Sequence, residues 1–168
     1  MKTMMIKILL VAAALTTTSL IANAGALSVT ETTTLIAPPA KVWATIGNFG
    51  SLGWHPAVAK TEITKGTAGH AGAVRKITLQ DGALIIEEQL SQQDHALTYR
   101  IVDSPLPVTG YESELKIEAD GDHTKVIWSS TFDAKEGVKD EDAKGAIVDV
   151  YNGGFEALKK KQFGGSAQ

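Results

Sequence analysis

Alternation of polar and apolar residues predicts that most of this chain is β-structure. Residues 28–36 alternate in this way and are rich in Thr and Val, which is typical of a strand. A short helical pattern follows, in which Val42, Trp43 and Ile46 share one face. From residue 54 to residue 132 one strand pattern follows another.

Asp81-Gly82 is a strong signal for a two-residue hairpin turn, and it pairs Leu79 with Leu84 and Arg75 with Glu88. One face of this hairpin is then mainly apolar and is expected to face the core: Arg75, Ile77, Leu79, Leu84, Ile86, Glu88 and Leu90. The opposite face is mostly polar and is expected to be solvated: Lys76, Thr78, Gln80, Ile85, Glu87 and Gln89. A bulge would reverse this choice and favour Glu87 over Glu88.

A second hairpin turns at residues 120–123. Its register places Ser113 opposite Ser130, and the same face carries further pairs: Ile117 with Val126, Leu115 with Trp128, and Tyr111 with Phe132. Between the hairpins, residues 95–102 form a strand with Leu97, Tyr99 and Ile101 on one face.

The last element is a helix. Acidic residues at 140–142 suit its first turn, Lys residues at 159–161 its last turn, and Gly164-Gly165 its end. Its length of about 22 residues corresponds to roughly 33 Å. The apolar stripe consists of Ile147, Tyr151, Gly154, Phe155 and Leu158. Adjacent glycines at 153–154 indicate close packing against the sheet, room for a ligand, or a hinge.

The first 24 residues are typical of a cleavable signal peptide. Lys2 and Lys7 precede a short apolar run, and Ala22-Asn23-Ala24 is a small-residue cleavage site. We therefore expect one domain over residues 25–168 and a periplasmic location. Without Lys2 and Lys7 the formal charge of −3 becomes −5, which disfavours nucleic acid and anionic membranes as partners. The sequence has no cysteine, so core burial must stabilise the domain.

The order of these elements resembles an α+β helix-grip fold, in which a curved antiparallel sheet of about seven strands wraps a long C-terminal helix after two short helices that follow strand 1. The matching residues are Pro39 with Val42-Trp43, Trp54-His55-Pro56, Gly72-Ala73-Val74-Arg75, Asp81-Gly82 with Glu87-Glu88, Tyr99, Pro105-Leu106-Pro107 with Tyr111, and Trp128. They resemble the START/Bet v1-like (SRPBCC) superfamily and its polyketide cyclase/dehydrase and lipid-transport family. Within that family the chain is similar to periplasmic accessory proteins of bacterial methanol oxidation (MxaD-like), which implies a periplasmic dehydrogenase/cytochrome system as a partner.

A cavity between sheet and helix would hold a hydrophobic or amphipathic small molecule. The candidate polar contacts are Arg75, Glu88, Tyr99, Ser113 and Ser130. The candidate walls and mouth are Trp54, His55, Ile77, Leu79, Ile86, Leu115, Trp128, Phe132, Tyr151 and Phe155. Arg75 and Glu88 can equally be a buried ion pair with no role in ligand binding.

Glu88, Tyr99 and His55 are the candidates for acid–base catalysis, although His55 also suits a packing or gating role. The four histidines lack ligand spacing, so no metal is predicted. Without cysteine there is no haem-attachment motif, and no cofactor is predicted.

Three functions remain open at this point. The leading interpretation is a non-enzymatic binding or accessory protein with no stable membrane insertion. The first alternative is a cyclase/dehydrase-type enzyme. The second is a protein-docking module with an acidic surface and a vestigial cavity.

Overall fold

The computed structural model describes residues 25–163, and the expected signal peptide lies outside these residues. The elements follow in the order β1 (Leu27–Leu35), α1 (Pro39–Ile46), β2 (Val58–Lys65), β3 (Val74–Leu79), β4 (Leu84–Gln93), β5 (Ala96–Asp103), β6 (Val108–Asp120), β7 (His123–Ala134), α2 (Asp140–Ala157) and the π-helical η1 (Leu158–Phe163). The predicted helix-grip architecture, a curved seven-stranded antiparallel sheet with a long C-terminal helix, is confirmed.

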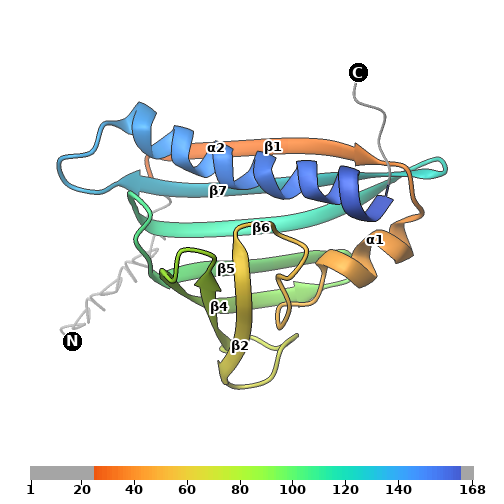
Figure 1. Ribbon diagram of the computed structural model, residues 1–168, viewed down its shortest axis with the longest axis horizontal. Coiled ribbons are helices and arrows are strands. Elements are labelled where there is room, and N and C mark those ends of the chain that lie inside the picture. The colour runs from red at the N-terminus through yellow and green to blue at the C-terminus, as the bar shows by residue number, and fades with distance from the viewer. Residues whose placement is uncertain (1–24, 164–168) are drawn as a thin grey trace, which may run out of the picture.

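The sheet has the order β1-β7-β6-β5-β4-β3-β2, so the first strand of the chain pairs with the last. Figure 1 shows α2 lying along one face of the sheet near β1 and β7, with β2 at a steep angle at the other edge. This strong curvature follows from the right-handed twist between neighbouring strands, summed over the sheet. It gives the sheet a concave side, which α2 partly covers.

Within residues 25–163 only one helix, α1, lies between β1 and β2, so the prediction of two short helices was wrong. After α1 the chain passes through a series of turns from residue 47 to residue 57. Glycines at positions 47, 50 and 53 and the proline at 56 disfavour helix propagation there. This segment, residues 47–57, instead lies over the concave side and is called the roof below. Its Phe49 and Trp54 side chains are buried.

The β3–β4 hairpin has a three-residue turn rather than the predicted two-residue turn. Leu79 N donates to Ala83 O at 2.9 Å, and Gly82 N donates to Leu79 O at 3.0 Å. Gly82 has a φ of +86°, the left-handed conformation that the extra residue of such a turn requires. Ile77 therefore lies opposite Ile85, one residue away from the predicted partner.

This shift of one residue exchanges the two faces of β4, because side chains alternate along a strand. Ile85, Glu87 and Gln89 face the core and are buried. The predicted inward positions of Ile86 and Glu88 were wrong. Leu84, also predicted to face inward, is 50% exposed.

The second hairpin has the predicted register over most of its length. Leu115 lies opposite Trp128 and Ser113 opposite Ser130. An irregularity between Thr109 and Glu112 interrupts the ladder before the predicted Tyr111–Phe132 pair. The two rings still stack, with centroids 6.1 Å apart, so both side chains remain in the core.

Helix α2 begins with three acidic residues, at positions 140–142, as expected from the helix dipole. The predicted apolar stripe is buried against the sheet: Ile147, Tyr151, Gly154, Phe155 and Leu158. Among the helices of residues 25–163, none combines the length and apolar character that crossing a membrane requires.

Phe132→Ala should reduce the free energy of unfolding by about 3–5 kcal/mol, because Phe132 is a fully buried core residue. Urea unfolding followed by circular dichroism measures this change. Ile36→Ala is the control: Ile36 is 54% exposed, and its loss should cost less than about 0.5 kcal/mol. Equal effects of the two substitutions would contradict the assigned core.

Candidate functional site

A small cavity lies between the concave side of the sheet, the 52–58 segment and α2. Its volume is about 90 Å³. It separates the main core from a smaller cluster formed by Val58, Ile77 and Ile85. The lining is mostly apolar and consists of Leu52, His55, Ala57, Val58, Arg75, Ile77, Leu79, Ile85, Glu87, Tyr99, Ile101, Leu106, Tyr111, Trp128, Ile147 and Val150.

Arg75 and Glu87 form the charged part of the cavity wall. They lie opposite each other on β3 and β4, and Arg75 Nε donates to Glu87 Oε2 at 2.6 Å. Arg75 Nη1 also donates to the carbonyl of Phe49 at 3.0 Å. The guanidinium lies over the rings of Phe49 and Tyr99, at 4.3 and 5.2 Å from their centroids. These contacts stabilise a cation that is only 3% exposed.

Glu88, the carboxylate predicted for this place, lies on the opposite face of β4. It accepts hydrogen bonds from Arg100 at 2.6 and 3.0 Å in a partly exposed ion pair. The sequence left Glu87 open as the alternative, because a bulge in the hairpin would turn this residue inward in place of Glu88. The Asp81-Gly82 dipeptide does not distinguish a two-residue turn from a three-residue turn with Gly82 in the left-handed position.

An aromatic cluster fills the space under the C-terminal half of α2. Trp128 stacks on Tyr151 with ring centroids 4.3 Å apart, and Trp54 and Phe155 pack against the same indole. A Cβ atom on Gly154 would lie 3.0 Å or less from atoms of His55 and Trp54. Gly154 is therefore explained by close packing, whereas a Cβ on the adjacent glycine at 153 would meet no atom within 4 Å.

This cluster restricts the cavity to one side of the concave face. Of the residues predicted from the sequence, six line it: His55, Arg75, Ile77, Leu79, Tyr99 and Trp128. Seven others lie in the surrounding structure rather than on the cavity wall: Trp54, Ser113, Leu115, Ser130, Phe132, Tyr151 and Phe155. Four further lining residues were not predicted, because only tertiary packing brings them there: Leu52 in the roof, Val58 at the start of β2, Leu106 between β5 and β6, and Val150 on α2.

A hydrogen-bonded network of hydroxyl groups joins the cavity to the aromatic cluster. Trp128 Nε1 lies 2.9 Å from Tyr99 Oη and 3.1 Å from Ser113 Oγ, and the hydroxyls of Tyr111 and Tyr151 are 2.5 Å apart. Burial raises the pKa of all three tyrosines, and the nearby carboxylate of Glu87 raises that of Tyr99 further. The three phenols therefore stay protonated at neutral pH.

Both ring nitrogens of His55 are occupied by backbone groups. Ala57 N donates to His55 Nδ1 at 3.2 Å, so His55 Nε2 carries the proton and donates to the carbonyl of Val150 at 2.8 Å. Burial lowers the pKa of His55, and the bond to Val150 only partly opposes this effect. The imidazole is thus held neutral as a link between the roof and α2. Within residues 25–163, no group of three or more metal-ligating side chains could hold a metal ion.

Glu87→Gln should destabilise the protein by about 3–5 kcal/mol, because it leaves the buried Arg75 cation without its counter-charge. Glu88→Gln is the matched control, with an expected cost of at most about 1 kcal/mol for a partly exposed pair. Urea unfolding at pH 7 measures both values. A larger loss for the Glu88 variant would show that the assigned register of β4 is wrong.

Acidification should weaken the fold through His55. Because its pKa is lower in the folded state, the unfolded chain takes up the proton first. The contribution of His55 to the free energy of unfolding is therefore complete above the pKa of His55 in the unfolded chain, about 6.5. It is lost as the pH falls toward the lower pKa of His55 in the folded protein. His55→Gln should show a smaller loss of unfolding free energy between pH 7.5 and pH 5 than the parent. Identical losses in urea titrations would exclude this role.

Comparisons with known proteins place this chain in a family. The model of the family described as polyketide cyclase / dehydrase and lipid transport matches residues 26–162. Among solved structures, the protein XoxI from Bacillus cereus is 33% identical, with a TM-score of 0.73, and the match covers 79% of this chain and 93% of that one. A protein from Bacillus thuringiensis is 31% identical, with a TM-score of 0.72 and coverage of 79% and 96%.

Ara h 8.0201 is 24% identical over 79% of this chain and 94% of its own length, with a TM-score of 0.61, and shares the fold. No curated protein matches this sequence. The family match spans nearly all of the described residues, including both sides of the cavity. The chain therefore belongs to the polyketide cyclase / dehydrase and lipid transport family.

Proposed function

We propose that this protein is a non-enzymatic binding protein that holds a small amphipathic molecule in the cavity beneath α2. The observation that carries this proposal is the cavity itself, an apolar space with one buried ion pair in its wall. Ligand sites commonly combine apolar walls with a few polar groups that orient the ligand. The lipid transport named in the family description is also a binding function.

The volume of the cavity limits the size of the molecule. Pockets for drug-sized ligands measure roughly 300–1,000 Å³, and an engineered cavity of about 150 Å³ accepts benzene. A space of about 90 Å³ suits a compound of only a few non-hydrogen atoms. A lipid chain or a polyketide would require the roof to move away from the sheet.

A cyclase/dehydrase-type enzyme is less well supported as an alternative. Acid–base catalysis needs a group that is free to exchange a proton with the substrate. Glu87 is paired with Arg75, both nitrogens of His55 bond to the backbone, and the pKa of Tyr99 is raised. Glu88 lies outside the cavity and cannot act on a molecule inside it.

We propose a periplasmic location on the basis of the signal-peptide pattern in residues 1–24. The resemblance to periplasmic accessory proteins of methanol oxidation supports a dehydrogenase/cytochrome system as the partner.

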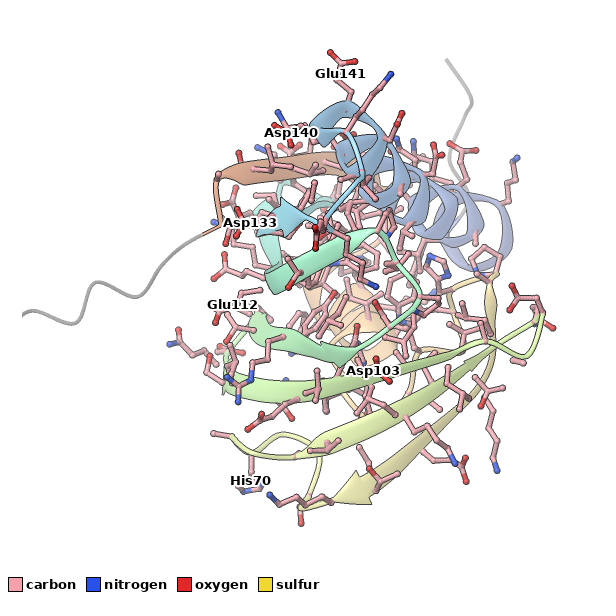
Figure 2. The ribbon with its side chains drawn as sticks, turned by 90° about the vertical axis from the view of Figure 1, so that its left-hand side faces the viewer. His70, Asp103, Glu112, Asp133, Asp140 and Glu141 are labelled. Atoms are coloured by element: carbon pink, nitrogen blue, oxygen red, sulfur yellow. The ribbon has the colours of Figure 1, made fainter. Side chains whose placement is uncertain are left out.

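A docking role has its own support in the acidic side chains at one end of the molecule. Figure 2 shows them on four elements: Asp103, Glu112, Asp133, Asp140 and Glu141. A complex formed through this end would weaken as salt concentration rises.

Protein purified from periplasm should carry a small molecule that native mass spectrometry detects as added mass. Ile101→Trp should remove this mass, because Ile101 lines the cavity and a larger ring would fill it. Val102→Trp is the matched control, since the neighbouring side chain is 57% exposed and lies outside the cavity. Bare parent protein under gentle conditions, together with a salt-sensitive complex with a basic partner, would favour docking instead.

A further inference from the structure

Two polar atoms of the Arg75–Glu87 pair remain available after their known hydrogen bonds are counted. Arg75 uses Nε for Glu87 Oε2 and Nη1 for the carbonyl of Phe49. Across residues 25–163 the structure shows no hydrogen bond for Arg75 Nη2 or for Glu87 Oε1.

Neither atom is sealed in the protein interior. In the described part of the chain, the buried side-chain nitrogen and oxygen atoms that lack both a partner and accessible surface belong to Thr33, Trp54 and Ser130. Arg75 Nη2 and Glu87 Oε1 therefore retain accessible surface. Because both residues line the cavity and are otherwise buried, this surface faces the cavity.

The chemistry of these atoms defines what the cavity accepts. Arg75 Nη2 is a donor and Glu87 Oε1 is an acceptor. The charges of the pair cancel, so an ionic ligand would introduce a buried charge without a counter-charge, at high cost. A pure hydrocarbon would displace water and leave both atoms unsatisfied, which is also unfavourable.

We propose that the cavity selects a small neutral molecule whose polar end donates one hydrogen bond to Glu87 Oε1 and accepts one from Arg75 Nη2. Alcohols and amides have this chemistry. The apolar remainder of the molecule would contact Ile77, Ile85 and Ile101 on the cavity wall. This inference rests on the proposed binding function and assigns its ligand class.

Four compounds of similar size, small enough for a cavity of about 90 Å³, test the selection. 2-Propanol and acetamide represent the alcohol and the amide, isobutane lacks a polar group, and isopropylammonium carries a charge. Each is titrated into the full mature protein, and its dissociation constant is measured from NMR chemical-shift changes. 2-Propanol, acetamide or both should bind about tenfold more tightly than isobutane, as expected for one or two net hydrogen bonds. Isopropylammonium should bind more weakly than either neutral polar probe.

Arg75→Met combined with Glu87→Leu should remove the preference for the polar probes while leaving an apolar cavity. Proteins often tolerate replacement of a complete buried ion pair by apolar residues. Arg100→Met combined with Glu88→Leu is the matched control, because the same substitutions there alter the ion pair on the outer face of the sheet. The control variant should keep the preference of the parent.

The outcomes separate this inference from the proposed function. If isobutane binds as tightly as the polar probes, or if the preference survives in the folded Arg75/Glu87 variant, the ligand class is wrong although the cavity still binds. If none of the four probes binds, the binding function fails as well. The comparison of probes on the unaltered protein decides the question if the double variant does not fold.

Discussion

The buried ion pair between Arg75 and Glu87 is the interaction on which the cavity depends. A charge removed from water needs a counter-charge and hydrogen bonds, and here each residue supplies the counter-charge of the other. The pair joins β3 to β4 in one particular register, because a shift of one residue would bury Glu88 and expose Glu87. It also anchors the roof, since Arg75 donates to the carbonyl of Phe49.

Aromatic packing then determines how much of the concave side stays open. The stack of Trp128 on Tyr151 attaches α2 to β7, and Gly154 lets Trp54 and His55 approach the helix closely. This packing fills the space that a larger ligand would occupy. What remains is a small space beside the stack, bordered by the ion pair and the apolar side chains of β3 to β5.

These two features together explain why binding is better supported than catalysis. Each titratable group at the cavity already has a structural role: Glu87 balances Arg75, His55 links the roof to α2, and Tyr99 accepts a hydrogen bond from Trp128. Groups held in this way can orient a ligand through their remaining donors and acceptors. Burial lowers the pKa of His55 and raises that of Tyr99, which keeps both side chains neutral and favours recognition over proton transfer at these two groups.

The sequence alone determined the sheet and the terminal helix, because periods of two and of 3.6 residues are local properties of the chain. It also determined the register around Ser113 and Ser130, where the turn at 120–123 is unambiguous. Only the tertiary structure decided between Glu87 and Glu88, because Asp81-Gly82 fits two turns of different length and the need to bury a counter-charge for Arg75 favours one of them. The roof side chains and the small cavity volume likewise depend on packing between distant segments, which no local pattern encodes.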